Sequence, residues 1–416
     1  MDNILYFQRK NSKEKLRQEQ KQVVIAAQKE SFSTKDLSLL RTALADMPIA
    51  RNFATIITGI RRCGKSTLLL QLLKKNYKSA LYLNFEDIRL TGFEHSDFVR
   101  LKNEIDRQKQ KALFFDKIQL VEKWEIFIHQ LLNENYTVFV TGSNASLLSR
   151  EMGTHLTGRH LSMELFPFSY PEFLRYNKIK ASKNTVAAYL QSGEMPEFVK
   201  NKQPLILNAL TEDIVIRDIA VRHNIRDTYP LKQLVVYLMS NVGKPLSANK
   251  LTGMFGIKSA TTMLEYFAYC RDSYLVDFLP QFSYSLKAQA RNPKKVYAID
   301  TGFINAVSLS FSEDNRHKFE NMIYLYLRRK YKELFFFKEK GECDFVVFEN
   351  GKIQQLMQVC YHINDQNFER EYNGLLEAMK FFGKKEGTIV TMEQKDEFGK
   401  DGFSIKLVPA HEFLSS

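Results

Sequence analysis

The sequence predicts an α/β fold whose N-terminal part contains a mainly parallel sheet. Short apolar runs with the composition of buried strands recur along this part of the chain. The strand candidates are Asn52–Thr58, Ala80–Phe85, Ala112–Phe115 and Thr137–Thr141. Helical stretches, such as Thr67–Leu73 and Trp124–Leu132, separate them. Strands that alternate with helices pair in parallel, because each helix returns the chain to the same edge of the sheet.

Length and charge set the broad class of the protein. The chain has 416 residues, which is enough for two or three domains. Its net charge of +13 favours an acidic partner, nucleic acid first and an anionic membrane surface second. A solvated basic surface without such a partner is the alternative.

The four cysteines are scattered and form no C-x-x-C pair, so neither a zinc site nor a disulfide framework is indicated. Free thiols suit a reducing compartment. The apolar runs are shorter than a membrane span needs, and the first residues do not have the pattern of a signal peptide. We therefore expect a cytoplasmic protein.

A glycine-rich segment follows the first strand candidate. It matches the G-x-x-x-x-G-K-[ST] pattern of a phosphate-binding P-loop and consists of Gly59, Ile60, Arg61, Arg62, Cys63, Gly64, Lys65, Ser66 and Thr67. The glycines let backbone N–H groups approach the phosphates, and the helix that follows directs its N-terminus at them. We expect Lys65 to reach the β and γ phosphates of ATP and Ser66 to bind Mg²⁺.

A second strand candidate ends in a carboxylate. The apolar run from Lys111 closes on Asp116, a pattern typical of the aspartate that holds Mg²⁺ beside a P-loop. We therefore expect ATP and Mg²⁺ as cofactors, with Ser66 and Asp116 as the metal residues. An ordinary aspartate at a strand end is the alternative.

Together these motifs resemble the prokaryotic AAA-type P-loop ATPases that carry a C-terminal domain of unknown function. The resemblance rests on Thr58–Ser66, Leu83–Asp87, Phe115–Gln119 with Trp124 and Glu125, Thr141–Asn144 and Leu156–Arg159. It implies that Ser143 or Asn144 senses the γ-phosphate. It also implies that Arg159 is an arginine finger for a neighbouring subunit of a homo-oligomer. A surface arginine is the alternative for Arg159.

One position departs from the family pattern. Where these ATPases usually have a glutamate that polarises the attacking water, this chain has Lys117. An ammonium group cannot accept the proton, and loss of a general base typically lowers the rate by about 10²–10⁴-fold. Glu86, at the end of the preceding strand candidate, is a possible substitute. We therefore expect ATP binding, with slow hydrolysis or a nucleotide-gated switch as the consequence of Lys117.

The resemblance also implies the domain order. It is a basic N-terminal extension (1–35), an AAA-type P-loop ATPase domain (36–175), a helical connector (176–230), a winged helix (231–305) and an α/β nuclease-like domain (306–416). In the winged helix, we expect three helices between Leu231 and Arg271, followed by strands at Tyr274–Leu279 and Lys295–Ile299. The basic residues expected to contact DNA phosphates through the wing are Lys287, Arg291, Lys294 and Lys295. A protein–protein face is the alternative.

The last part resembles the PD-(D/E)XK nuclease fold. Glu320, Asp344 and Gln358 match the positions that gather a metal ion there. The position of the water-activating lysine is Cys360, which we expect to pack as a small apolar group. The sequence therefore predicts a degenerate nuclease domain.

The function that these observations favour is ATP-dependent action on, or regulation at, nucleic acid. One alternative is a non-enzymatic protein-interaction module gated by nucleotide. A less favoured alternative is an active metal-dependent nuclease.

Overall fold

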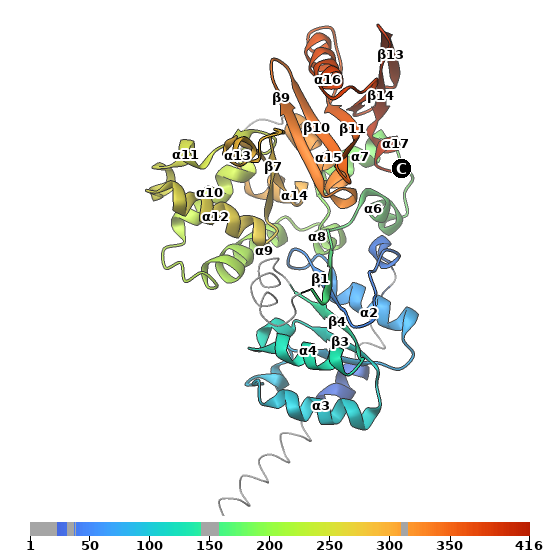
Figure 1. Cartoon of the computed structure of the whole chain (residues 1–416), viewed down its shortest axis with the longest axis vertical. Helices are drawn as coiled ribbons and strands as arrows, with labels where there is room; N and C mark the ends of the chain where they lie inside the picture. The colour runs from blue at the N-terminus through green and yellow to red at the C-terminus, as the bar shows by residue number, and fades with distance from the viewer. Residues whose placement is uncertain (1–22, 31–36, 38, 143–157, 309–314) are drawn as a thin grey trace, which may run out of the picture. The chain divides into compact units, whose positions relative to one another are not determined.

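The computed structural model describes residues 23–30, 37, 39–142, 158–308 and 315–416. By its internal contacts the chain divides into two compact units, each drawn in Figure 1. The N-terminal unit comprises Met1–Gly59 and Gly64–Leu165. The C-terminal unit comprises Ile60–Cys63 and Phe166–Ser416.

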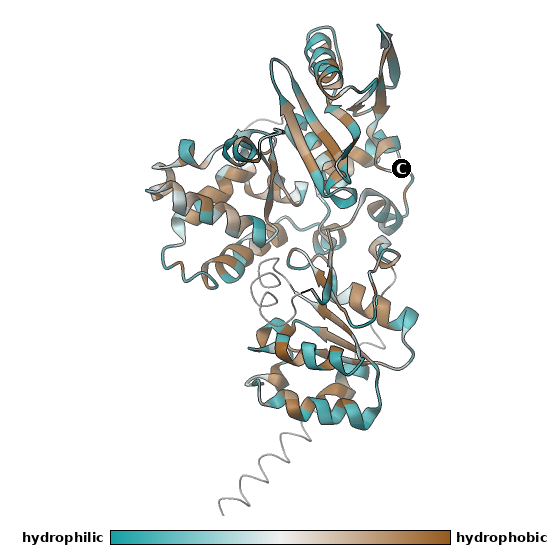
Figure 2. Cartoon of the chain, in the orientation of Figure 1, coloured by the Kyte–Doolittle hydropathy of each residue, from teal (hydrophilic) through white to brown (hydrophobic). Residues whose placement is uncertain are grey.

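A five-stranded sheet forms the centre of the N-terminal unit. Its strands are β1 (Ala54–Thr58), β2 (Leu81–Asn84), β3 (Ala112–Asp116), β4 (Thr137–Thr141) and β5 (His160–Glu164). The strand order is β2-β3-β4-β1-β5, and each pairing is parallel. Figure 2 shows hydrophobic colouring along β3 and β4, in keeping with their buried residues. The predicted α/β fold with a parallel sheet is confirmed.

The sequence pattern does not predict β5, the edge strand of this sheet. Four of its residues are partly exposed and the central Ser162 is exposed, so no buried apolar run marks it. The strand forms because β1 offers a second free edge, and the register runs from Ala54 opposite His160 to Thr58 opposite Glu164. Pairing with a buried neighbour therefore defines β5, rather than its own composition.

Helices cover the two faces of this sheet. They are α2 (Lys65–Asn76), α3 (Asp97–Gln108) and α4 (Trp124–Asn133), with short 3₁₀ turns η1 (Thr42–Leu44), η2 (Ile88–Leu90) and η3 (Ile118–Leu120). Residues 23–30 are also helical, and Val24 and Ile25 belong to the same hydrophobic core as Trp124. The Gln28 side chain hydrogen-bonds Asn84 in both directions, at 2.8 and 3.1 Å. Within the predicted N-terminal extension, residues 23–30 are therefore a helix that packs against the folded core.

The C-terminal unit begins with helices. They are α6 (Tyr170–Asn177), α7 (Lys183–Ser192), α8 (Pro196–Asn201), α9 (Leu205–Asp213), the π-helix η4 (Ile214–Ala220), α10 (Tyr229–Ser240), α11 (Ala248–Leu251), η5 (Met254–Gly256), α12 (Ala260–Asp272) and α14 (Thr301–Val307). Serine side chains cap two of these helices. Ser247 accepts a hydrogen bond from the Lys250 N–H at the start of α11, and Ser259 accepts one from the Thr262 N–H at the start of α12.

A small antiparallel sheet accompanies α10, α11 and α12. Its strands are β6 (Pro245–Leu246), β7 (Val276–Pro280) and β8 (Lys294–Ala298), in the order β6-β8-β7. A short helix, α13 (Leu286–Arg291), lies between β7 and β8 in the chain. The expected helices and strands are thus present, and the winged-helix assignment stays a prediction.

The remaining residues build a six-stranded mixed sheet. Its strands are β9 (Glu333–Lys338), β10 (Glu342–Glu349), β11 (Lys352–Val359), β12 (Glu386–Thr391), β13 (Asp396–Lys400) and β14 (Phe403–Pro409), and its helices are α15 (Asn315–Lys330), α16 (Phe368–Phe382) and α17 (Ala410–Phe413). The strand order is β13-β14-β12-β11-β10-β9. Strands β12 to β14 and helix α17 were not predicted from the sequence. β13 is polar and mostly exposed, so only its pairing with β14 identifies it as a strand.

Helix α15 continues the hydrogen-bond ladder of β8 through one side chain. The Asn321 amide oxygen accepts from the Ala298 N–H at 2.7 Å, and its amide nitrogen donates to the Ala298 carbonyl at 3.0 Å. Asn321 is fully buried. The side chain therefore satisfies two backbone groups that water does not reach.

Asn321→Ala should lower the free energy of unfolding by about 3 kcal/mol, because two buried backbone groups lose their partner. Urea unfolding followed by circular dichroism measures this change. Asn249→Ala, at an exposed position of α11, is the matched control and should leave the curve within error of the wild type. Equal midpoints for the two variants would contradict a structural role for Asn321.

Candidate functional site

The P-loop connects β1 to α2. Gly59 and Gly64 have φ angles of 137° and 104°, which residues with a Cβ rarely adopt. A Cβ on Gly64 would also lie 3.0 Å from the Arg41 guanidinium. The Lys65 ammonium donates to the Gly59 carbonyl at 2.8 Å, so it lies across the loop at the first turn of α2. Ser66 is the second residue of α2 and half-buried, and Thr67 is exposed.

The side chains at the tip of the loop pair with carboxylates. Ile60–Cys63 groups with the C-terminal unit, and within that unit Arg61 donates to Asp218 at 2.8 and 3.0 Å. Arg62 pairs with Glu197 at 2.7 Å, and Cys63 is buried. The groups of this segment that could contact a phosphate are therefore its backbone N–H groups rather than these side chains.

Asp116 ends β3 and is almost completely buried, at 1% exposed. The Tyr82 hydroxyl donates to one of its carboxylate oxygens at 3.0 Å, and the Thr141 hydroxyl donates to the other. Thr141 also accepts from the Lys117 N–H at 3.0 Å. Burial, with Asp116 as a further cause, raises the pKa of Tyr82 well above its usual value, so Tyr82 stays a donor. Neighbouring strands thus hold the carboxylate in a fixed orientation.

The two residues proposed to govern hydrolysis contact each other. The Lys117 ammonium forms an ion pair with the Glu86 carboxylate. The Glu86 side chain is about half exposed, at 54%, and that of Lys117 is 33% exposed. Glu86 therefore lies on the same edge of the sheet as Asp116, as the sequence analysis expects, but its carboxylate is paired with a cation.

Three further positions, Ser143, Asn144 and Arg159, were predicted as site residues. Ser143 and Asn144 are outside the described residues. Arg159 precedes β5 and donates to the Asn133 side chain at the end of α4. Its role toward a neighbouring subunit stays a prediction.

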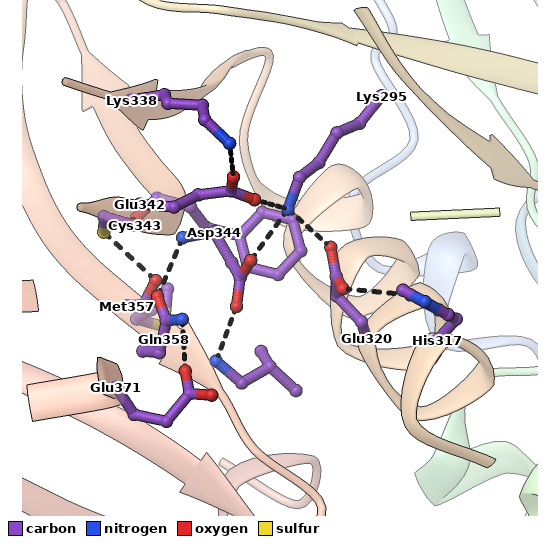
Figure 3. Close-up of polar contacts among 12 residues, drawn as sticks. Lys295, His317, Glu320, Lys338, Glu342, Cys343, Asp344, Met357, Gln358 and Glu371 are labelled. Atoms are coloured by element: carbon purple, nitrogen blue, oxygen red, sulfur yellow. Dashed lines mark hydrogen bonds and ion pairs between the residues drawn. The ribbon is translucent and has the colours of Figure 1, made fainter. Parts of the chain in front are cut away.

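The C-terminal unit contains a buried cluster of charges (Figure 3). The Lys295 ammonium, on β8, lies 2.9 Å from Glu320, 2.8 Å from Glu342 and 2.7 Å from Asp344. The Lys295 side chain is only 2% exposed. An ammonium has three donors and no acceptor, so three carboxylates satisfy it completely.

A second layer of hydrogen bonds fixes these carboxylates. The Tyr297 hydroxyl donates to Glu320 at 2.6 Å, and the Val359 N–H donates to Asp344 at 3.0 Å. Lys338 donates to the second oxygen of Glu342 at 2.8 Å. On the far side of Asp344, Gln358 accepts from the Asp344 N–H at 3.1 Å and donates to Glu371 at 2.5 Å.

Burial and charge act in opposite directions on this cluster. Burial opposes the charge of Lys295, but Asp344, Glu320 and Glu342 raise the pKa of its ammonium well above the usual value. Burial also favours neutral Glu320, yet Lys295 and nearby hydrogen bonds lower the pKa of that carboxyl to about 2. Burial raises the pKa of Asp344 to about 7. Lys295 therefore stays charged, and burial makes Asp344 easier to protonate than an exposed aspartate.

The position of Lys295 corrects one prediction. A lysine enclosed by three carboxylates cannot contact a DNA phosphate, so Lys295 does not belong to the basic wing. Lys287 and Arg291, on α13, are exposed, and Lys294 is partly exposed. Cys360 is buried in the hydrophobic core beside α16, which confirms that it packs as an apolar group.

Among the described residues, no helix is long and apolar enough to cross a membrane, and no group of His, Cys, Asp and Glu has the arrangement of a metal site.

Comparison with known proteins places the chain in a family. It is 33% identical over 361 residues to the uncharacterized protein MJ1544 of Methanocaldococcus jannaschii, a match that covers 80% of each chain. This chain belongs to the same family as that archaeal protein. An uncharacterized protein of Haemophilus influenzae is 28% identical over 344 residues, which is 77% of this chain and 85% of that protein. Residues 51–174 match the AAA domain, and residues 183–315 match a domain of unknown function, DUF8612.

Solved structures give weaker similarities. AMPPCP-bound DnaA from Aquifex aeolicus is 17% identical, covering 55% of this chain and 75% of that chain with a TM-score of 0.26. The RuvB Holliday junction branch migration motor of Thermotoga maritima is 15% identical, covering 61% and 88% with a TM-score of 0.29. Similarities at this level carry no argument about the present chain.

Two residues of the buried cluster, Tyr297 and Glu342, were not predicted from the sequence, and Lys295 was assigned to the wing instead. Lys295 and Tyr297 alternate with apolar residues along β8, and Glu342 and Asp344 flank Cys343 on β10. Side chains two residues apart on a strand share a face, so each pair was recognisable as a polar face within an apolar strand. That the two faces meet is visible only in the folded chain.

Thr141→Val should lower the free energy of unfolding by about 2 kcal/mol, because the buried Asp116 carboxylate loses a donor and the Lys117 N–H loses an acceptor. The single tryptophan, Trp124, lies in the core of this unit, and its fluorescence during urea unfolding measures the change. Thr137→Val, at the partly exposed start of the same strand, is the control. Coincident unfolding curves would show that Thr141 does not hold Asp116 in place.

Proposed function

We propose that this protein is an ATP-binding AAA-type ATPase. The observation that carries the proposal is the P-loop at the carboxyl end of β1, within the segment that matches the AAA domain. Ligands of parallel α/β sheets bind at this edge, where helix N-termini and loops converge. The left-handed glycines and the position of Lys65 fit a phosphate group. Mg²⁺ would be held by Ser66, with Asp116 as the carboxylate beside it.

Lys65→Ala should abolish ATP binding, because it removes the ammonium that would contact the β and γ phosphates. Calorimetric titration of the full chain with Mg²⁺–ATP measures the affinity. Lys75→Ala, on an exposed position of the same helix, is the control and should bind as the wild type does. Unchanged affinity in Lys65→Ala would refute the assignment of the P-loop.

We propose further that hydrolysis is slow, because the carboxylate best placed to polarise water is neutralised by Lys117. The ion pair between Lys117 and Glu86 lies next to Asp116 in the chain and at the same edge of the sheet. A carboxylate that is paired with an ammonium is a weaker proton acceptor than a free one. A nucleotide-gated switch without turnover is the alternative that this pair supports.

Lys117→Glu should raise steady-state ATP turnover by about tenfold or more, because it supplies a carboxylate at the family position and releases Glu86. Lys117→Ala separates the two effects, since it only releases Glu86. If both variants gain equally, Glu86 is the base. If neither variant differs from the wild type, the proposal about Lys117 is wrong.

A second function, binding of nucleic acid, is supported by a basic hollow in the C-terminal unit. A cavity of about 570 Å³ lies between α12 and α13, and Arg271, Arg291 and Lys294 line it. None of the residues that line this cavity is acidic. We propose that this surface contacts phosphates without reading the sequence, which is the usual role of such clusters.

Affinity for duplex DNA should fall linearly with salt on a log–log plot, with a slope of about −0.9 for each phosphate neutralised. The triple change of Lys287, Arg291 and Lys294 to Ala should flatten that slope by about two to three. The matched control changes three exposed lysines of the N-terminal unit, Lys74, Lys75 and Lys78, to Ala. No DNA binding at low salt, together with intact ATP binding, would favour a protein-interaction module instead.

A further inference from the structure

The fold that the C-terminal part resembles implies a metal ion between Glu320, Asp344 and Gln358. These residues do approach one another, but the space among the carboxylates already contains a cation. The Lys295 nitrogen lies 2.7–2.9 Å from the three carboxylate oxygens. Divalent metals bind such oxygens at about 2.0–2.6 Å, so a metal ion and this ammonium would compete for the same position. The residues present therefore do not fit a metal ion.

We infer that Lys295 is a built-in cation that takes the place of a metal ion, so that this centre is an ionic junction within the C-terminal unit rather than a hydrolytic site. The inference does not depend on ATP binding, because every residue concerned lies outside the P-loop. It rests on the positions of Lys295, Glu320, Glu342 and Asp344.

The junction connects three elements of the unit. Lys295 comes from β8, Glu320 from α15, and Glu342 and Asp344 from β10. Tyr297, two residues after Lys295, stacks on Tyr324 of α15 at 4.1 Å between ring centroids. The small antiparallel sheet is thereby joined to the mixed sheet through charged and aromatic contacts together.

The ammonium at the centre of the junction is closed off from solvent, although the Glu342 side chain is 30% exposed. Lys295 is 2% exposed, and its ammonium also lies 5.6 Å from the centre of the Phe336 ring. Gly243 packs against the other side, where a Cβ would lie 2.9 Å from His317 and 3.1 Å from Glu320. The Glu320 and Asp344 side chains are only 11% and 8% exposed, so a phosphodiester has little access to them.

Buried charges explain why the lysine is needed. Without it, three carboxylates would share a site from which water is largely excluded, and removal of one partner from a buried ion pair is strongly destabilising. Lys295→Met keeps most of the side-chain volume and removes the charge. In Lys295→Met, a small divalent cation is the group best able to replace the lost positive charge.

The experiment is differential scanning calorimetry of the full chain with and without Mn²⁺. Lys295→Met should lower the melting temperature of the C-terminal unit by about 10 °C. Mn²⁺ should recover part of that loss while leaving the wild type unchanged. Lys294→Met, at the neighbouring, partly exposed position of β8, is the control and should melt with the wild type. Equal melting temperatures for the two variants, or no recovery by Mn²⁺, would overturn the inference.

A second measurement does not depend on whether Lys295→Met folds. Mn²⁺ bound by the wild type and by Asp344→Asn is counted by electron paramagnetic resonance of the free ion. Equal numbers per chain are expected, because Lys295 occupies the junction. A bound Mn²⁺ that is lost in Asp344→Asn, or Mn²⁺-dependent DNA cleavage that is lost in it, would show a working metal site and overturn the inference.

Discussion

A single ammonium group organises the C-terminal unit. Lys295 is surrounded by Glu320, Glu342 and Asp344, so strand β8, helix α15 and strand β10 must approach within hydrogen-bond distance of one atom. Charges taken out of water are costly unless each is paired and hydrogen-bonded. The surrounding donors meet this condition, because Lys338 and the Val359 N–H contact the second oxygens of Glu342 and Asp344. The Tyr297 hydroxyl donates to the same Glu320 oxygen as Lys295. Asn321 adds backbone hydrogen bonds between the same helix and strand.

The N-terminal unit follows a different principle. Its parallel sheet is apolar on both faces, and polar side chains gather where the strands end. Hydroxyl groups from the two neighbouring strands orient the Asp116 carboxylate there. Its orientation therefore does not require a bound ligand. The P-loop supplies backbone groups at the same edge, and Lys117 places a positive charge beside Glu86. Binding and hydrolysis of a nucleotide would therefore depend on different residues of this edge.

The two units thus differ in the partners of their buried carboxylates. In the N-terminal unit, the Asp116 carboxylate accepts hydrogen bonds from neutral hydroxyl groups. No cation of the chain itself is paired with it in these hydrogen bonds, so the arrangement suits a cation that binds reversibly. In the C-terminal unit, the carboxylates enclose a cation that is covalently part of the chain. Because a lysine cannot be exchanged for a metal ion, we propose that this centre has a structural rather than a metal-dependent role.

The parallel sheet, the P-loop and Asp116 could be predicted from the sequence, because they depend on local patterns: apolar runs, a glycine spacing and a strand that ends in an acid. The sequence also identified Glu320, Asp344 and Gln358 as a polar group. Only the tertiary structure shows that the Lys295 ammonium lies among these side chains. Lys295 lies 25 residues before Glu320 and 49 before Asp344, and a lysine beside Lys294 resembles any exposed basic pair. Only the packing of β8 against α15 and β10 buries one lysine and leaves its neighbour at the surface, because alternate residues of a strand face opposite sides.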